Sequence, residues 1–216
     1  MSHLYAFRFK KEDYLTHHGV EGQQWGVRNG PPYPLDRKHG NYRRDDKVFI
    51  SGTSKMDTPE EKYYRKQLPA SVKTELDSMM KAGSKILVGD CFGADDMVQL
   101  YLAGNRYRNV EIYVTGKEVR HNRDDGKLGW KVHHIDGSKY EKGSTEWHAV
   151  KDIAMNKEAT KGLAIILDTG AKATRRNIDR FIDEGKPCYI YALDSRGEAY
   201  DRPMSEGLYR TKKKEM

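Results

Sequence analysis

Two glycine-containing turns, each after a short apolar run, carry residue types suited to binding a phosphate. Residues 48–50 lead into the turn 51–54, and residues 86–88 lead into the turn 89–95. Glycine lets the backbone approach a ligand closely, and a helix that begins after such a turn offers free N–H groups to an anion. The two turns together predict a site for a phosphate or a nucleotide.

In the first turn, the candidate ligand-binding residues are Gly52, Thr53 and Ser54. The two hydroxyls could contact a phosphate or a ribose. The simpler alternative is an ordinary turn from a strand into a loop, in which the hydroxyls only cap the chain.

The second turn provides candidates of two kinds. Glycine and alanine would let the start of a helix lie against a ligand, and an aspartate could bind ribose hydroxyls or orient a base. The candidates are Gly89, Asp90, Gly93, Ala94 and Asp95. The alternative for Asp95 is that it complements the positive end of the following helix. The spacing matches neither a Walker A loop nor Gly-x-Gly-x-x-Gly.

A third polar turn follows the apolar run 162–167 and leads into another predicted helix. Thr174 can cap this helix, and the basic pair that follows, Arg175 and Arg176, could form an anion site with the free N–H groups. The ligand-binding candidates here are Asp168, Thr169, Gly170, Thr174, Arg175 and Asn177. An ordinary polar loop is the alternative.

The elements around these turns alternate between strand and helix patterns, which predicts an α/β fold. We expect a Rossmann-like parallel sheet of about five strands with helices on both faces. The predicted strands are 48–52, 86–89, 110–114, 162–167 and 188–193, with a short strand near 132–135 in a long polar loop; the predicted helices are 58–81, 94–103, 147–159 and 174–184. Ligands bind at the carboxyl ends of such strands, so the three turns should converge on one crevice.

Three segments are predicted along the chain. Residues 1–46 contain a Gly-Pro-Pro-Tyr-Pro stretch without a sustained apolar period and form an irregular N-terminal arm. Residues 47–195 form the Rossmann-like domain, and residues 196–216 form a basic C-terminal tail.

The charge of the chain indicates which classes of partner it is expected to bind. The net charge of +7 is spread along the 216 residues rather than gathered in one patch, so nucleic acid is not the expected main partner, whereas an anionic small ligand fits.

No apolar run approaches the roughly 18 residues that span a membrane, and the N-terminus lacks a signal-peptide core. The two cysteines fit a reduced cytoplasmic protein. The histidine pairs 17–18 and 133–134 lack metal-ligand spacing, so we expect neither a metal nor another cofactor.

The positions above together resemble the SLOG superfamily, a Rossmann-like group that includes nucleotide-ligand sensors and Lonely-Guy-type phosphoribohydrolases. The resemblance covers residues 47–193. It rests on the Gly-Thr-Ser turn at 52–54, on Gly89, Gly93 and Asp95, and on residues 151–156 (Lys-Asp-Ile-Ala-Met-Asn), which are similar to an Arg-Asn-x-x-Met helix. Ala173-Thr174 corresponds to its Gly-Thr pair. The resemblance implies a nucleotide-derived ligand, with Asn156 among the binding residues, and a homo-oligomer.

One departure from the resemblance weakens an enzymatic interpretation. Lonely-Guy-type enzymes carry Pro-Gly-Gly-x-Gly-Thr followed by a pair of glutamates, whereas this chain has Arg175, Arg176 and Asn177 after Thr174. If the chain cleaves an N-glycosidic bond of a nucleotide or NAD-like substrate, Asp90, Asp95 or Glu146 must supply the carboxylate that stabilises the oxocarbenium-like centre. The sequence leaves open whether the ligand is cleaved or only bound.

A second resemblance lies in the arm. Residues 17–28 (HHGVEGQQWGVR) look like a short motif of head-associated and virion proteins of phages of Gram-positive bacteria. This implies a phage or prophage protein, located in the host cytoplasm or on the virion, whose arm could dock on a capsid or virion protein. Three functions follow: a module that binds or sequesters a nucleotide-derived signal, an N-glycosidic hydrolase or transferase, and a virion-associated structural protein.

Overall fold

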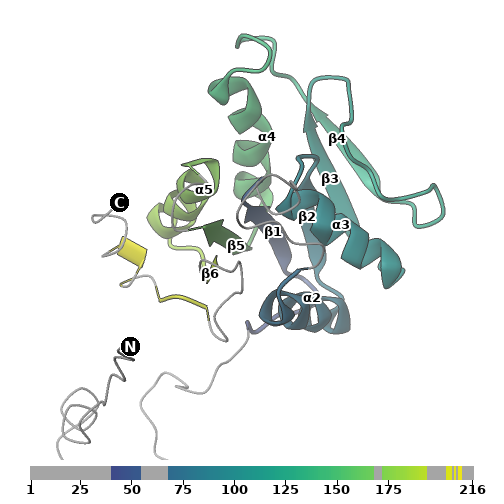
Figure 1. Cartoon of the computed structure of the whole chain (residues 1–216), viewed down its shortest axis with the longest axis vertical. Coiled ribbons are helices and arrows are strands. Elements are labelled where there is room, and N and C mark those ends of the chain that lie inside the picture. The colour runs from purple at the N-terminus through teal and green to yellow at the C-terminus, as the bar shows by residue number, and fades with distance from the viewer. Residues whose placement is uncertain are drawn as a thin grey trace, which may run out of the picture. The chain divides into compact units, whose positions relative to one another are not determined.

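The computed structural model describes residues 40–54, 68–167, 172–193, 203–205, 207, 209 and 210. Strands and helices alternate through this part of the chain (Figure 1). The strands are β1 (Lys47–Gly52), β2 (Lys85–Gly89), β3 (Val110–Thr115), β4 (Lys131–Ile135), β5 (Lys161–Leu167) and β6 (Cys188–Leu193); the helices are α2 (Ala70–Ala82), α3 (Ala94–Gly104), α4 (Thr145–Glu158) and α5 (Lys172–Asp183). The α/β class is confirmed.

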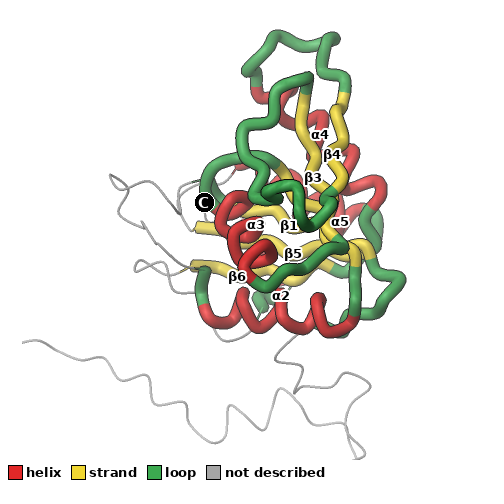
Figure 2. The backbone as a smooth tube through the Cα atoms, turned by 90° about the vertical axis from the view of Figure 1, so that its right-hand side faces the viewer, coloured by secondary structure: helices red, strands yellow, loops and turns green. Residues whose placement is uncertain are grey.

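The six strands form one sheet in the order β4-β3-β2-β1-β5-β6, and all five neighbouring pairs are parallel. The sheet therefore has one strand more than the five that were predicted as its main members. The additional strand is β4, the short strand expected inside the long loop, which adds to the edge beside β3. In Figure 2, β3 and β4 and the loops joined to them extend to one end of the view.

Both faces of the sheet are covered by helices, as the sequence predicted. Alternate strand residues point to opposite faces. Ile50 packs in one core cluster with Leu76 of α2 and Leu102 of α3. Phe49, its neighbour in β1, packs in a second cluster with Met155 of α4 and Phe181 of α5. This burial on both faces explains why the central strands are continuous apolar runs rather than alternating ones.

The strand order reverses at β1. The chain moves from β1 through β2 to β3 in one direction, whereas β5 and β6 lie on the other side of β1. The loops that leave β1 and β5 must therefore diverge to opposite faces, which leaves a crevice at the carboxyl ends of these two strands. The predicted turns follow β1, β2 and β5, so the topology positions all three at this edge.

Residues 40–46, the described end of the predicted arm, pack against the domain. Tyr42 is buried, and its hydroxyl donates a hydrogen bond to Glu75 of α2 at 2.6 Å. The amide of Gly40 and the hydroxyl of Tyr191 also donate to this buried carboxylate. Residues 1–39 lie outside the described part of the chain, as do most of residues 196–216. None of the described helices has the length and apolar character needed to cross a membrane.

Gly52 is required by close packing rather than by its backbone conformation. A Cβ atom at this position would lie 2.2 Å from Cβ of Ala94, at the start of α3. We therefore expect Gly52→Ala to lower the free energy of unfolding by about 1–3 kcal/mol, the usual range for overpacking. Urea unfolding measures this change. Gly104→Ala is the matched control, because a Cβ at Gly104 meets nothing within 4 Å. Equal stability of Gly52→Ala and the wild type would contradict the expectation.

Candidate functional site

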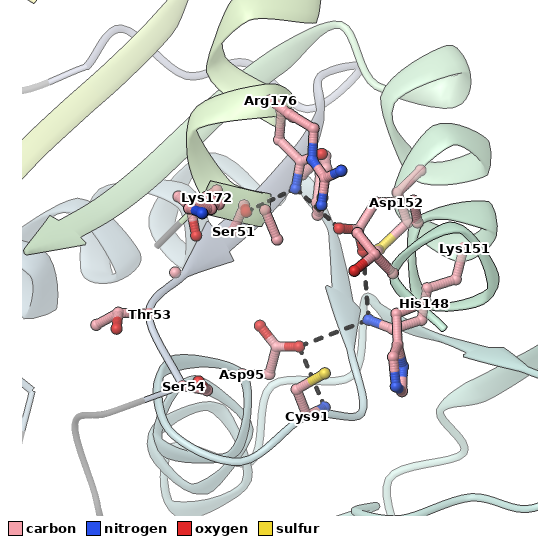
Figure 3. A pocket seen from close by; sticks show the side chains of 18 of the residues that line it. Ser51, Thr53, Ser54, Cys91, Asp95, His148, Lys151, Asp152, Lys172 and Arg176 are labelled. Carbon is pink, nitrogen blue, oxygen red and sulfur yellow. Dashed lines mark hydrogen bonds and ion pairs between the residues drawn. The ribbon is translucent and has the colours of Figure 1, made fainter. Parts of the chain in front are cut away.

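A cavity of about 440 Å³ lies at the carboxyl edge of the sheet, beside the strand reversal (Figure 3). Four segments and one loop residue line it. They are the end of β1 with the residues that follow it, the turn between β2 and α3, one face of α4, the first turns of α5, and Arg120 from the loop between β3 and β4. The cavity therefore lies where the topology predicts a ligand site.

The first two turns are held directly against each other. The amide of Ala94 donates to the carbonyl of Thr53 at 3.0 Å, and the amide of Thr53 donates to Ile165 of β5 at 3.1 Å. Gly93 has a φ of 78°, and a Cβ on it would lie 2.5 Å from the Thr53 oxygen. Only glycine fits this contact without strain. The turn after β2 is thus fixed on the turn after β1.

Lys151 of α4 is a buried cation surrounded by carboxylates. Its side chain is 3% exposed, and its Nζ lies 3.4 Å from Asp152, 3.8 Å from Asp95 and 3.9 Å from Asp90. Burial alone would lower the pKa of Lys151, but these negative neighbours outweigh it and raise the pKa above the ordinary value. The amine therefore stays charged, and it neutralises part of the acidic wall of the cavity.

Gly89 makes room for this cluster. A Cβ at Gly89 would lie 2.3 Å from both the Asp95 Oδ2 and the Lys151 Nζ. The absence of a side chain at the end of β2 thus allows an ion pair to form directly over the sheet edge. Gly89 itself does not line the cavity.

Asp90 is held behind the cavity wall by Arg120. The guanidinium donates to both carboxylate oxygens, at 2.6 and 3.0 Å, and the Arg120 amide donates at 3.2 Å. Burial would raise the pKa of Asp90, but the hydrogen bonds from Arg120 and the charge of Lys151 lower it overall. Asp90 is 1% exposed and does not line the cavity, whereas Arg120 does. This aspartate positions the arginine rather than facing a ligand.

Asp95, by contrast, lines the cavity. Burial raises the pKa of its carboxyl to about 6, with the charge of Asp152 adding to the shift and that of Lys151 opposing it. Its Oδ2 accepts a hydrogen bond from the amide of Cys91 at 3.2 Å. In Figure 3, the Asp95 carboxylate faces the Lys151 amine. A carboxyl with a pKa near neutrality can both donate and accept a proton at physiological pH.

Cys91 lines the same cavity, but burial raises the pKa of its thiol. A nucleophilic cysteine needs the opposite shift. His148, which is half-buried on the α4 wall, has a lowered pKa because of burial and the charges of Arg120 and Lys151.

Asn177 connects three elements at the site. Its amide nitrogen donates to the Ser51 hydroxyl of β1 at 2.8 Å and to Asp152 of α4 at 3.1 Å. Its oxygen accepts from Arg180 at 2.6 Å. These bonds fix the first turns of α5 against the end of β1. Lys172 and Arg176, on these same turns, are exposed and line the cavity opposite Asp95.

The α5 wall is suited to an anion. The first turn of α5 contains no acidic residue. Lys172, Arg176 and Arg180 all line the cavity on this side. The N-terminal N–H groups of a helix add a positive dipole at the same place. Among the described residues, no group of three histidine, cysteine or acidic side chains could hold a metal ion.

The structure brings some predicted residues together in the cavity and leaves others out. The predicted residues that line it are Gly52, Thr53, Ser54, Asp95, Thr174 and Asn177. Gly89, Asp90, Gly93 and Ala94 support it from behind. Arg175, Glu146 and Asn156 do not line it: Glu146 is exposed in the first turn of α4, and the buried Asn156 amide faces Glu184. Asp168, Thr169 and Gly170 lie outside the described residues, as does the motif at 17–28.

On α4, the sequence pointed to Glu146, Asn156 and the segment 151–156, but the residues of this helix that line the cavity were missed as site residues. They are Thr145, His148, Ala149, Lys151, Asp152 and Met155. His148 lies three residues before Lys151 and four before Asp152, and Met155 follows them by four and three, which places all of them on one helix face. That spacing was a usable signal, together with the adjacent lysine–aspartate pair. Arg120 gave no such signal, because it lies in a loop and is held at the site by contacts with Asp90 and Cys91, which are distant in the sequence.

Neither the models of known protein families nor the curated proteins contain a match to this chain.

The raised pKa of Asp95 predicts a pH-dependent effect of Asp95→Asn. Its pKa is higher in the folded protein than the ordinary 3.8, so ionisation costs stability as the pH rises from about 4 through about 6. Asparagine removes that cost. We expect the variant to be more stable than the wild type at pH 8, by up to about 3 kcal/mol at 1.36 kcal/mol per pKa unit. The gain should vanish at pH 4.

Thermal unfolding of both proteins between pH 4 and pH 8 measures the difference. Asp125→Asn is the control, because Asp125 is exposed and its pKa is lowered by its hydrogen bond with Lys127. The control should show no gain at pH 8. A loss of stability in Asp95→Asn at pH 8 would show that the carboxylate is a net stabilising partner of Lys151.

Proposed function

We propose that this chain is a SLOG-like, phage-type protein that binds a nucleotide-derived small molecule, such as an ADP-ribose-like or cyclic nucleotide signal, and retains it. Retention of such a signal would counter a host defence that depends on it. The observation that supports this proposal is the cavity itself, which joins the hydroxyl-bearing turn after β1 to the cationic first turns of α5.

The size and charge of the cavity fit this class of ligand. Its volume of about 440 Å³ lies within the range of about 300–1,000 Å³ that small-molecule sites usually have. Lys172 and Arg176 offer charge-assisted hydrogen bonds to phosphate oxygens. Ser51, Thr53 and Ser54 offer hydroxyls that can bind phosphate or ribose. A neutral or cationic ligand would leave the positive charges on the α5 side of the cavity without a negative partner.

The arrangement of the acidic residues favours binding over cleavage. Asp90 is fully engaged by Arg120, and Glu146 is exposed outside the cavity. The position where hydrolases of the resembled type carry glutamates is occupied by Arg175 and Arg176. Of the three candidate catalytic carboxylates, only Asp95 reaches the cavity.

N-glycosidic cleavage is the second candidate, and Asp95 is the observation that favours it. With a pKa of about 6, Asp95 could protonate the leaving base as the bond from C1′ to nitrogen breaks. Water would then add to C1′ and lose a proton to the carboxylate, giving free base and a sugar phosphate. Asp152, on the α4 wall of the cavity, would stabilise the positive charge that develops at C1′.

Incubation of the purified chain with a panel of ligands separates the two functions. The panel consists of AMP, ADP-ribose, a cyclic dinucleotide and NAD. Mass spectrometry then identifies the small molecules in the filtrate and those released by heating the washed protein. The proposal expects one panel member to be released unchanged only on heating. Free base in the filtrate would instead establish cleavage.

Asp95→Asn serves as the matched variant in this experiment. If the chain cleaves its ligand, the variant should bind the ligand and release it intact. If the chain only retains its ligand, wild type and variant should both release it unchanged. Absence of every panel member from the heated protein would contradict the proposal.

A further inference from the structure

Phe92, in the turn between β2 and α3, is an exposed aromatic residue at the cavity. Its side chain is 57% exposed, and it lines the cavity. Four other large apolar side chains of the described residues are exposed: Leu100, Val119, Tyr140 and Ile153. None of these four lines the cavity. Single exposed apolar residues are common on protein surfaces, so Phe92 is distinguished by its position at the cavity rather than by its exposure.

The turn fixes Phe92 toward solvent. The residue before it, Cys91, donates its amide to Asp95 at 3.2 Å. The residue after it, Gly93, packs against the backbone of Thr53 and Ser54 so tightly that no Cβ would fit. Both neighbours are therefore held, and the backbone between them presents the ring at the cavity. The chain therefore keeps an apolar ring at the cavity where a polar residue would be better solvated.

The ring is supported by a neighbouring side chain but keeps most of its surface exposed. Phe92 and His121 make an edge-to-face contact, with ring centroids 4.4 Å apart and planes inclined by 73°. His121 is held in turn by Asp96, at 3.4 Å. With this contact in place, 57% of the Phe92 side chain remains exposed to a ligand. The support limits the entropy that the ring would lose on stacking with a ligand.

We propose that Phe92 stacks on the base of the nucleotide, so that the site recognises the base as well as the phosphate. This inference rests on the proposed function. The α5 side of the cavity supplies cations for phosphate, and Phe92 supplies a flat apolar surface on the turn that carries Asp95. Stacking on an aromatic ring tolerates any base, because every base has a π-face. The site therefore selects a base-bearing ligand over a sugar phosphate without selecting one particular base.

The test compares AMP with ribose 5-phosphate by calorimetry on the full chain. These two ligands share the sugar and the phosphate and differ in the base. We expect the wild type to bind AMP at least tenfold more tightly than ribose 5-phosphate. Phe92→Ala should weaken AMP binding by roughly 10- to 100-fold, from the usual range for one stacked base. It should leave ribose 5-phosphate binding unchanged.

Two further variants serve as an aromatic replacement and as a control. Phe92→Trp should keep AMP affinity, and the indole fluorescence that it introduces should be quenched by AMP but not by ribose 5-phosphate. Leu100→Ala is the control, because Leu100 is 48% exposed and does not line the cavity. It should change neither affinity.

The outcomes separate this inference from the function on which it rests. If the wild type binds both ligands and Phe92→Ala lowers both affinities or neither, the stacking role is wrong and the anion site stands. If the wild type binds ribose 5-phosphate as tightly as AMP, the base is not recognised. If the wild type binds neither ligand at millimolar concentration, both proposals are wrong.

Discussion

Lys151→Met should lower the free energy of unfolding by about 3–5 kcal/mol at pH 7.5, the usual range when one partner of a buried ion pair is removed. Methionine nearly preserves the volume of the side chain, so the effect reports the charge. The Lys151 amine lies within 4 Å of Asp90, Asp95 and Asp152. Without it, Arg120 still neutralises Asp90, but Asp95 and Asp152 lose the cation that lies within 4 Å of both.

The difference in free energy of unfolding between Lys151→Met and the wild type should become smaller as the pH falls. Asp95 has a raised pKa of about 6 even with Lys151 present, and removal of the amine raises it further. Protonation of the folded protein therefore relieves the repulsion between about pH 7 and pH 4, where the unfolded chain still carries the charge. Urea unfolding at pH 7.5 and at pH 5 measures the change.

Lys127→Met is the matched control for this prediction. Lys127 and Asp125 form an ion pair at 2.6 Å, but both side chains are largely exposed. Exposed pairs contribute little to stability, so the unfolding midpoint should not move at either pH. If both lysine variants behave alike, the buried cluster does not hold the site together as described.

Arg176→Glu should weaken the binding of AMP by about 100-fold. A hydrogen bond from a charged group contributes about 1.5–3 kcal/mol, and the new carboxylate also repels the phosphate. Arg176 is exposed and lines the cavity, so the substitution should leave the fold intact. Calorimetry at fixed ionic strength measures the affinity, and thermal unfolding confirms that stability is unchanged.

Arg108→Glu controls for the change in overall charge. Arg108 is exposed in the segment before β3 and does not line the cavity, yet its reversal alters the net charge by the same amount. Its AMP affinity should stay within twofold of the wild type. An equal loss in both variants would show that AMP responds only to the general positive field of the chain.

The fold could be predicted because its signals are local. Strands buried on both faces appear in the sequence as continuous apolar runs, as β1 and β5 do, and small residues follow each run where the chain turns into a helix. The place of β4 was harder to predict. None of its five residues is fully buried, so burial gave only a weak pattern, and its pairing beside β3 depends on the long loop before it.

The site could be predicted only in part, because half of it is formed by long-range contacts. The turns after β1 and β2 lie at strand ends and carry glycine, so their meeting follows from the topology. Arg120 instead reaches the site by pairing with Asp90, and Lys151 lies within 4 Å of Asp90 and Asp95, all of which are distant in the sequence. Nothing local distinguishes Arg120 from the other 38 basic side chains of the chain, whose lysines and arginines number 39 in all.

The central claim is that a nucleotide-type anion binds in the cavity beside the strand reversal. Titration of the ¹⁵N-labelled chain with AMP, followed through backbone amide shifts, tests this claim most directly. The shifts should be largest at residues 51–54, at residues 91–95 and at the start of α5, and they should saturate with one affinity. Unchanged spectra at millimolar AMP, or shifts confined to residues away from these three segments, would contradict the claim.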